Sequence, residues 1–428
     1  MSLPSRLLSV ALLLLARECV SWTVAACDIK GCLVAGVTHE DYIHLRDCPC
    51  PSNSSDKLNS SSLCLPVDFA SKTSRKEVFA FSVNKDDLWK HYDWEQLTTV
   101  AWNEDKQLLC HAHSKGVKVV LKHNFDDVDQ LCNRTARQDW IMVVRQRCQA
   151  LHSACVERAA YFKIVENYAD GVNIDIEKPL HGATSHCLGI LVHELRHELM
   201  RHALTENAQI TFDVPWAPRG VDGRYYPWRE LSNAADFLFV MSYDMRSQVY
   251  DACIAGANSP LALVKQGLQE YLFAYDIAPD KLVLGVPWYG YRYQCLEREG
   301  EATDDASSCQ IRPVPFFGAP CSDAVGRQID YGDIRLLVKS HGLVERWDVL
   351  TQTPFVSYSL DGRRSQIWFD NLQSLKAKYA LVRELGLRGV GMWNADTLSY
   401  SAANDSQLMW GSLARAFASN IPVESLQG

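Results

Sequence analysis

Residues 170–180 read DGVNIDIEKPL and combine the pattern of a buried strand with three polar side chains. Every second residue from Val172 is a branched apolar one, and the residues between them are Asn173, Asp175 and Glu177. Because side chains alternate across a strand, these three polar groups face the same way, about 6–7 Å apart from one to the next. Burying carboxylates costs several kcal/mol unless they are paired or used. The stretch therefore predicts a buried strand that carries a functional site.

Further short apolar runs accompany this strand and alternate with helical patterns. Together the candidate strands lie at 77–83, 98–102, 117–122, 171–177, 209–214, 237–244, 281–290 and 387–393. Most are near-continuous apolar runs, as expected when helices cover both faces of a parallel sheet. Helical patterns lie between them, for example at 186–207 and 374–386. Eight strands alternating with helices predict a (β/α)8 TIM barrel, with a doubly wound open sheet as the alternative.

The chain is expected to divide into four parts. Residues 1–16 are predicted to be the core of a signal peptide, because a basic residue precedes an apolar run too short to span a bilayer; the cleavage site stays open. Residues 17–75 are irregular and rich in Cys and Ser, and the barrel is expected over 76–415. Within the barrel, residues 291–372 separate the last two strands and are predicted to form a small α+β insertion with a hairpin around Asp361-Gly362.

The composition is that of a globular, secreted protein. A net charge of −8 and a pI of about 5.9 argue against a nucleic-acid partner. Beyond the N-terminus no run of 18 or more apolar residues occurs, so we expect no membrane anchor, and we expect a monomer. The 15 cysteines fit an oxidising compartment, and CPC at 48–50 is interpreted as a disulfide stretch whose pairing stays open. Sequons at Asn53, Asn59, Asn133 and Asn404 predict glycosylation at two or more of them.

Polar and aromatic residues gather where the predicted strands end, which in a TIM barrel is the edge that holds the active site. These residues are Asp175, Glu177, Asp213, Trp216, Tyr243, Asp244, Trp288, Tyr289, Tyr291, Trp393 and Asn394. Any one of them taken alone could be a cap or a core residue. Together, carboxylates among aromatic rings suit a carbohydrate ligand. Two carboxylates at i and i+2 are the components of a glycosidase, and the spacing leaves Asp175 open as a nucleophile, a base or a helper.

Three motifs resemble glycoside hydrolase family 18, the family of the chitinase-type barrels. DGVNIDIE at 170–177 is similar to the D-G-x-D-x-D-x-E signature of that family, MSYD at 241–244 to its M-x-Y-D on strand six, and GVGMWNA at 389–395 to its strand-eight Trp motif. From about Cys48 onward, stretches such as YDWEQLTTVAW and KLVLGVPWYGY resemble an exo-acting, lysosomal branch of the family. The fold implied by the resemblance is the same barrel.

The resemblance implies a role for each matching residue. Glu177 matches the general acid that later acts as base, and Asp175 matches the residue that orients the 2-acetamido group of the substrate. That group, rather than a protein carboxylate, attacks the sugar carbon. Tyr243 matches the hydroxyl that contacts the acetamide, and Trp393 the floor under the sugar. Further substrate-binding residues are expected at Asn173, Asp213, Asp244 and Trp288, whereas Asp170 is expected to be structural.

The chain departs from the family pattern in several places. Asn173 stands where the family has Asp, and our hypothesis is that its amide donates to Asp175 and holds that carboxylate ionised. The S-x-G-G of strand three is replaced by VVLKHNF. Residues 18–46 and 141–165 fit the family poorly and are insertions or sequence errors.

The resulting functional prediction is a lysosomal hydrolase. We expect it to split the N-acetylglucosamine β1-4 N-acetylglucosamine core of asparagine-linked oligosaccharides from the reducing end, with retention. The alternatives are a chitinase-like lectin, which would lose the acid residue, and an endo-chitinase, which would need a longer cleft. We expect neither cofactor nor metal, and HELRH at 193–197 is interpreted as a solvated helix face rather than a zinc site.

Overall fold

A computed structural model gives the structure of the chain. It describes residues 47–50, 61–67, 75–84, 86–141, 160–248, 252–296, 308–360, 362–401 and 403–417. The chain separates into two compact units, residues 1–47 and 48–428, and the elements below belong to the second. The predicted signal peptide and the doubtful stretch 18–46 lie outside the described residues, as do positions 142–159 of the second doubtful stretch.

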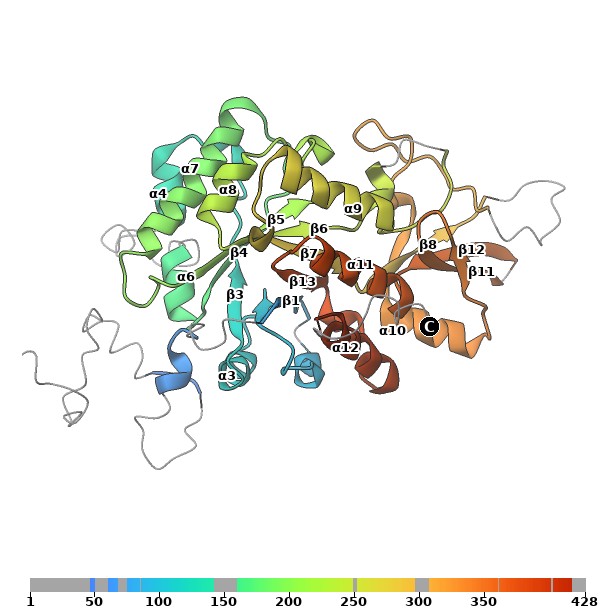
Figure 1. Cartoon of the computed structure of the whole chain (residues 1–428), viewed down its shortest axis with the longest axis horizontal. Coiled ribbons are helices and arrows are strands. Elements are labelled where there is room, and N and C mark those ends of the chain that lie inside the picture. Colours follow the sequence, from blue (N-terminus) through green and yellow to red (C-terminus); the bar gives the residue numbers. More distant parts are fainter. Residues whose placement is uncertain are drawn as a thin grey trace, which may run out of the picture. The chain divides into compact units, whose positions relative to one another are not determined.

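Eight parallel strands close into a barrel, which confirms the predicted fold (Figure 1). They are β1 (Glu77–Phe81), β2 (Thr99–Ala101), β3 (Lys118–Lys122), β4 (Gly171–Ile174), β5 (Gln209–Pro215), β6 (Phe237–Met241), β7 (Leu282–Pro287) and β13 (Gly389–Trp393). Each pairs with its neighbours in chain order, and β13 closes the ring against β1. All eight candidate strands are present, each within a few residues of its predicted bounds.

Helices lie outside the strands, as Figure 1 shows. They are α3 (Lys106–Ser114), α4 (Arg134–Ile141), α6 (Ala160–Glu166), α7 (Gly182–Leu199), α8 (Trp228–Ala234), α9 (Leu261–Gln269), α11 (Leu372–Glu384) and α12 (Ala403–Phe417). The two helical patterns named from the sequence correspond to α7 and α11. No helix among the described residues is both long and apolar enough to cross a membrane.

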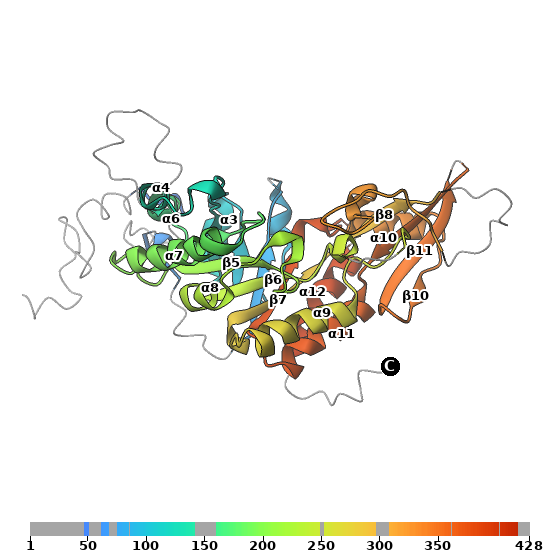
Figure 2. The same ribbon diagram turned by 90° about the horizontal axis from the view of Figure 1, so that it is seen from above.

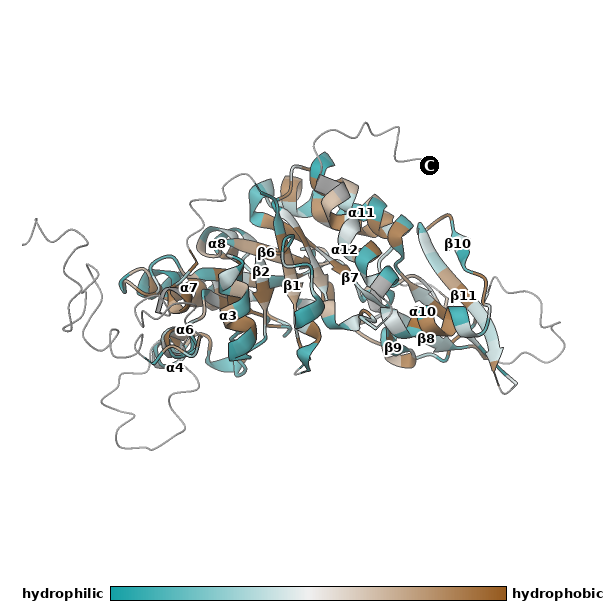
Figure 3. Ribbon diagram, turned by 90° about the horizontal axis from the view of Figure 1, so that it is seen from below, coloured by the Kyte–Doolittle hydropathy of each residue, from teal (hydrophilic) through white to brown (hydrophobic). Residues whose placement is uncertain are grey.

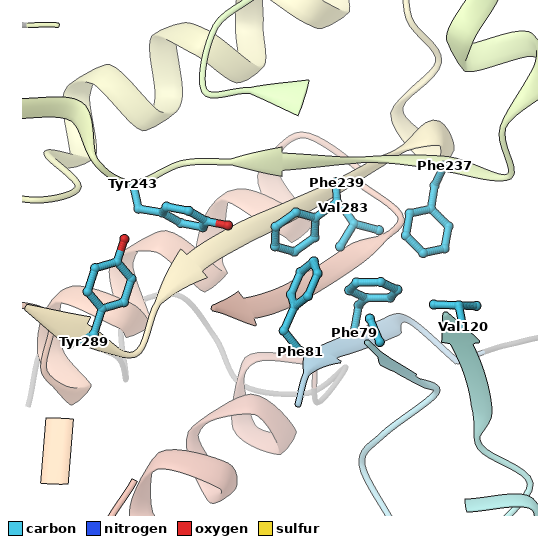
Figure 4. Close-up of a cluster of buried hydrophobic side chains, with 9 residues drawn as sticks. Phe79, Phe81, Val120, Phe237, Phe239, Tyr243, Val283 and Tyr289 are labelled. Atoms are coloured by element: carbon cyan, nitrogen blue, oxygen red, sulfur yellow. The ribbon is translucent and has the colours of Figure 1, made fainter. Parts of the chain in front are cut away.

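The barrel interior is a packed aromatic core rather than a channel. Rings and aliphatic groups from β1, β3, β6 and β7 meet there, and Figure 4 shows Phe79, Phe81, Val120, Phe237, Phe239 and Val283 pointing at one another. Figure 3 shows hydrophobic, brown residues along the barrel strands, whereas the surrounding helices carry both brown and teal residues. Tyr243 and Tyr289 extend this cluster toward the carboxyl ends of the strands. The aromatic core therefore packs against the residues at the carboxyl ends of the strands, where the site is predicted.

The glycine of the DGVNIDIE stretch, Gly171, is required by the close approach of the neighbouring strand. A Cβ atom built at this position would lie 1.9 Å from the backbone oxygen of Gln209, on the adjacent strand β5. No side chain can be accommodated at that distance, so only glycine lets β4 pair with β5 at this point. The register that follows places Asn173 opposite Thr211.

The insertion between β7 and β13 is a second, antiparallel sheet with one helix (Figure 2). Its elements are β8 (Tyr289–Gln294), β9 (Arg327–Asp330), α10 (Tyr331–Ser340), β10 (Arg346–Asp348), β11 (Thr353–Leu360) and β12 (Arg363–Phe369). The predicted hairpin is present, with Leu360 opposite Arg363. The sheet starts at Tyr289, two residues before the predicted boundary, because only Trp288 separates β7 from β8. The apolar run 281–290 thus contains the end of one strand and the start of another.

Disulfides fix the irregular segments to the barrel and the insertion. Cys48–Cys64 and Cys50–Cys110 tie the segment before β1 to α3, which confirms the disulfide interpretation of CPC. The others are Cys132–Cys187, Cys253–Cys321 and Cys295–Cys309. Residues 48–67 therefore belong with the barrel unit, although the sequence suggested a separate N-terminal segment. Of the sequons, Asn133 and Asn404 are exposed, whereas Asn53 and Asn59 lie outside the described residues.

A buried histidine adds a second link between this segment and the barrel. His113 Nδ1 lies 2.6 Å from the carbonyl oxygen of Leu63, and its Nε2 lies 2.9 Å from Asp170 Oδ2. A carbonyl and a carboxylate only accept hydrogen bonds, so both ring nitrogens must carry protons. Burial lowers the pKa of His113, but Asp170 and Leu63 outweigh it and raise this pKa above its usual value. Asp170 is therefore a structural residue, as expected.

We expect His113→Gln to lower the free energy of unfolding, and to lower it most at acid pH. Because the folded-state pKa of His113 is raised, its contribution is fully present below the ordinary histidine pKa and is lost as pH rises through the folded-state value. Breaking one side of a buried pair costs about 3–5 kcal/mol. Melting temperatures from pH 4.5 to 8.5 should show a large loss at acid pH that shrinks toward pH 8.5. The exposed His193→Gln is the control, and a pH-independent loss in His113→Gln would mean the ring is not charged.

Candidate active site

The end of β4 delivers three polar residues that run outward from the barrel interior. Asn173 lies within β4 and is fully buried. The side chain of Asp175 is 11% exposed and that of Glu177 is 52% exposed. The expectation that both carboxylates are buried is therefore wrong for Glu177, because the strand ends at Ile174 and the following loop carries Glu177 toward solvent.

Asp175 is held by neighbours from β3 and the loop after it. Its backbone N–H donates to Asn124 Oδ1 at 2.8 Å, and its Oδ2 lies 3.7 Å from Lys122 Nζ. That ammonium also lies 3.7 Å from the centre of the Trp102 ring. Burial and the neighbouring Glu177 raise the pKa of Asp175 to about 6, and Lys122 opposes the rise. Its Oδ1 is buried without a partner in the described part of the chain, so one acceptor of this carboxylate is unused.

Glu177 is paired with an arginine from the loop after β5. Arg224 Nη1 lies 2.9 Å from Glu177 Oε2, and Arg224 Nη2 lies 2.6 Å from Asp222 Oδ2. The arginine side chain is only 7% exposed, so its position is well defined. The two loops are joined by the backbone as well, since the N–H of Leu180 donates to the carbonyl of Gly223 at 3.1 Å. The Asp222–Arg224 pair thus orients the Glu177 carboxylate.

Arg224→Ala should lower kcat/KM by about 10²-fold, because a misplacement of about 1 Å at a reacting group can cost that much. The fold should persist, since the loop keeps its backbone bonds to the β4 loop. Arg219→Ala is the matched control, because Arg219 lies on the same loop and also pairs with a glutamate, Glu270. Steady-state kinetics would test this. Equal activity of the two variants would show that Arg224 does not orient Glu177.

Two tryptophans form an aromatic floor beside the carboxylates. The rings of Trp102, after β2, and Trp393, at the end of β13, lie 5.0 Å apart at 79°. Trp393 also packs on Phe81 at 5.0 Å, so the barrel core holds it in place. Trp102 has φ of 75°, a conformation that non-glycine residues rarely adopt. Such positions concentrate at functional sites, where surrounding packing maintains them.

Tyr243 and Asp244 follow the end of β6. Burial and the nearby Asp213 raise the pKa of Tyr243 well above its usual value, so its phenol remains a hydrogen-bond donor. Asp244 has φ of 54° and its carboxylate accepts a hydrogen bond from the Tyr289 hydroxyl of the insertion. Its backbone N–H donates to Asn258 Oδ1 at 2.7 Å. Asp244 therefore connects the barrel to the insertion.

Glu177, Tyr243 and Asp244 line a pocket of about 260 Å³, whereas Asp175 and the two tryptophans of the floor are not among its lining residues. The pocket is lined by residues of β5 and β6, of the loops after β4, β5 and β6, and of the insertion: Glu177, Pro215, Trp216, Val221, Asp222, Arg224, Met241, Tyr243, Asp244, Tyr291, Phe316 and Asp323. The insertion thus forms one wall and the barrel the other. Ligand pockets for drug-sized molecules measure about 300–1,000 Å³, so this one suits a short ligand.

Trp288 is not part of the site, which corrects the sequence prediction. Its ring is fully buried, its Nε1 lies 3.3 Å from the Tyr379 hydroxyl, and it packs edge-to-face on Trp410 at 5.0 Å. These partners belong to α11 and α12, outside the barrel. The alternation of side chains along the strand turns Trp288 toward the helices.

The side chain of Asn173 forms a hydrogen bond with Asp213 rather than with Asp175. The amide Nδ2 of Asn173 donates to Asp213 Oδ1 at 2.8 Å and to Thr211 Oγ1 at 2.9 Å. The hypothesis that this amide donates to Asp175 is therefore wrong. Sequence spacing along one strand could not show it, because the partner comes from the neighbouring strand β5.

The two histidines of HELRH lie on the exposed face of α7, whereas Leu195 between them is buried. His193 and His197 are exposed, and Glu194 accepts a hydrogen bond from Arg137 at 2.8 Å. Among the described residues, the one cluster of potential metal ligands consists of Cys48, Cys50 and Cys64, and all three form disulfides.

Sequence reasoning missed several residues of the site. Trp102 follows β2 directly, Lys122 is the last residue of β3 and Asn124 lies two residues after it, so the strand-end rule could have found them. Arg224 and Phe316 lie in loops far from any strand end, and no sequence signal marks them.

Comparison with known proteins identifies the class of this chain. The pattern of the Glycosyl hydrolases family 18 matches residues 60–397. The chain belongs to that family and is a glycoside hydrolase. It is similar to the Di-N-acetylchitobiase of Rattus norvegicus, with 41% identity covering 87% of this chain and 94% of the relative, and to that of Homo sapiens, with 39% identity covering 85% and 87%.

Solved structures share the fold. A GH18 chitinase from Cycas revoluta, in complex with (GlcNAc)4, matches with a TM-score of 0.61 over 80% of this chain and all of that one, at 17% identity. At that identity the likeness supports the barrel alone.

Proposed function

We propose that this glycoside hydrolase splits the N-acetylglucosamine β1-4 N-acetylglucosamine bond of chitobiose-type substrates. The observation that carries the proposal is the arrangement of Glu177, Asp175 and Tyr243 at the carboxyl edge of the barrel, beside a short pocket. The names of the related di-N-acetylchitobiases support the substrate class.

The three side chains suit substrate-assisted catalysis. Asp175 Oδ1 accepts the N–H of the substrate's 2-acetamido group, and the Tyr243 hydroxyl donates to its carbonyl oxygen. That oxygen bonds to C1 while the bond from C1 to the leaving oxygen breaks and Glu177 gives its proton to the leaving oxygen. Water then attacks C1, returns a proton to Glu177 and opens the oxazolinium ring, which leaves the configuration at C1 retained.

Arg224 suits the second half of this cycle. After Glu177 has given up its proton it is a carboxylate, and the neighbouring guanidinium stabilises that form. In the same state Glu177 is ready to accept a proton from water.

The insertion favours short substrates and action at a chain end. Tyr291, Phe316 and Asp323 of the insertion line the pocket together with Glu177, and we place the leaving sugar against this wall. A long chain would need a cleft that continues past this wall. We therefore propose that the enzyme acts at the reducing end, on the core of asparagine-linked oligosaccharides. We place this activity in the lysosome, because the ion pair between protonated His113 and Asp170 stabilises the fold at acid pH. Glycosylation and the monomeric state remain predictions.

Hydrolysis of chitobiose, chitotetraose and chitohexaose labelled at the reducing end tests the proposal at mildly acidic pH. We expect labelled N-acetylglucosamine to be the first product from each. Internal cleavage would favour an endo-chitinase. Binding without turnover would instead favour a lectin.

A further inference from the structure

The last residue of β3 is a lysine at the edge of the barrel that carries the site. Val120 belongs to the aromatic core (Figure 4), and Lys122, two residues further on, lies on the same face of the strand. The backbone of Lys122 is paired with that of Asn173 on β4. Lys122 also lies in the stretch VVLKHNF, which stands where the family pattern has S-x-G-G. The departure from that pattern therefore brings a cation to the site.

Two contacts fix the position of the Lys122 ammonium group. Its Nζ lies 3.7 Å from Asp175 Oδ2 and 3.7 Å from the centre of the Trp102 ring. The face of an indole ring attracts a cation, so the ring supports the ammonium group beside the carboxylate. The ring is itself held, because its Nε1 donates to Asn173 Oδ1 at 2.5 Å and it packs on Trp393 at 5.0 Å. The Lys122 side chain is 43% exposed, yet its charged end has a defined place.

The contact with Lys122 distinguishes the two oxygens of Asp175. Oδ2 faces the ammonium group, whereas Oδ1 is buried and has no partner in the described part of the chain. The backbone N–H of Asp175 is fixed separately, since it donates to Asn124 Oδ1 at 2.8 Å. Residues of β3 and of the loop after it thus hold Asp175 at its backbone and at its carboxylate. Rotation of the carboxylate would break the second of these contacts.

Several titratable and charged groups face the Asp175 carboxylate. They are Lys122 from β3, Glu177 from the loop after β4, Asp213 from β5, Arg224 and Tyr226 from the loop after β5, and Tyr243 after β6. Of the two cations, Arg224 forms ion pairs with Glu177 and Asp222, whereas Lys122 forms one with Asp175. Burial and Glu177 raise the pKa of Asp175 to about 6, and Lys122 has the largest of the effects that oppose this rise.

We propose that Lys122 is a positioning residue for the reaction, which binds Asp175 Oδ2 and leaves Oδ1 as the acceptor for the acetamido group of the substrate. Trp102 holds the ammonium group in that place, so one ring of the aromatic floor acts through Asp175. The positive charge also favours the ionised carboxylate, which is the form that stabilises the oxazolinium ion. This inference rests on the proposed function.

Two substitutions of Lys122 separate its charge from its bulk. Lys122→Met removes the charge and keeps an unbranched side chain beside Trp102, whereas Lys122→Arg keeps the charge. Both are made in wild type and in Asp175→Asn. Lys115→Met is the matched control, because the Lys115 side chain is 40% exposed and pairs with a carboxylate, Glu95, at 3.0 Å away from the site. Hydrolysis of chitobiose is measured from pH 3.5 to 8, and melting temperatures at pH 4.5 and 7.5.

We expect Lys122→Met to lower kcat about 10-fold with little change in KM, which corresponds to about 1.4 kcal/mol. Its acid limb should move to higher pH, because Asp175 loses a cation that favours its ionised form. Lys122→Arg should return the limb toward its wild-type position, and Lys115→Met should leave it unchanged. In Asp175→Asn, Lys122→Met should lower kcat by no more than about 2-fold further, since the group through which it acts is gone.

The melting temperatures test the same contact without relying on activity. Asp175 is ionised in the fold at pH 7.5 and protonated at pH 4.5, so Lys122→Met should lower the melting temperature more at pH 7.5. This difference between the two pH values should vanish in Asp175→Asn. If Asp175→Asn is too slow to assay, this comparison takes the place of the kinetic one.

An unmoved acid limb in Lys122→Met, with an active wild type, would overturn the inference. So would an equal loss of kcat with and without the Asp175 carboxylate, which would mean that Lys122 contacts the substrate rather than acting through Asp175. An inactive wild type would instead overturn the proposed function, and the inference would fall with it.

Discussion

Glu177→Gln is expected to abolish hydrolysis of chitobiose while leaving sugar binding intact. Glutamine keeps the shape of the side chain and can still contact Arg224, but it cannot transfer a proton. General acid–base catalysis contributes about 10²–10⁴-fold, so kcat should fall by that factor. Steady-state hydrolysis gives the rate, and calorimetric titration with chitobiose gives the affinity.

Glu384→Gln provides a control matched in exposure and pairing. The side chain of Glu384 is also 52% exposed and also lies near a cation, Lys265, but it belongs to α11. This variant should retain full activity. Comparable losses in both variants would point to a general effect of charge, and full activity in Glu177→Gln would remove Glu177 as the acid.

Asp175→Asn should cause the second-largest loss, about 10²–10³-fold in kcat, the range seen when one preorganised electrostatic group is removed from a catalytic site. The asparagine keeps the volume, and its backbone N–H can still donate to Asn124 Oδ1, as that of Asp175 does at 2.8 Å. It lacks the negative charge that stabilises the positive oxazolinium ion. The variant should also become more stable than wild type at neutral pH. The pKa of Asp175 is raised in the folded state, so its ionisation above about pH 6 costs stability that the amide does not lose.

The substrate provides an independent test of the same role. A chitobiose analogue with hydroxyl in place of the 2-acetamido group on the sugar being cleaved should not be hydrolysed by wild type. Asp276→Asn, at an exposed aspartate, serves as the control variant. Hydrolysis of the hydroxyl analogue at a rate that depends on Asp175 would indicate a protein nucleophile and contradict substrate assistance.

The pattern of apolar runs in the sequence was enough to predict most of the fold. Near-continuous apolar runs are what a parallel sheet covered by helices requires, and the order of those runs predicted the barrel and the insertion. The start of the insertion was misplaced because a single residue separates β7 from β8 and the apolar run 281–290 continues into the first residues of β8, so hydrophobicity alone could not divide the two strands. The strand-end rule likewise brought Asp175, Glu177, Tyr243, Asp244 and Trp393 to one edge.

By itself the sequence determined which residues lie on which strand, because the alternation of apolar and polar residues is a property of neighbours along the chain. The tertiary structure alone decided which side chains meet across strands and loops. Asn173 pairs with Asp213, Glu177 with Arg224, and Trp288 with the outer helices. Each of these contacts joins segments 12 or more residues apart, where pairing is set by packing in three dimensions rather than by spacing in the chain.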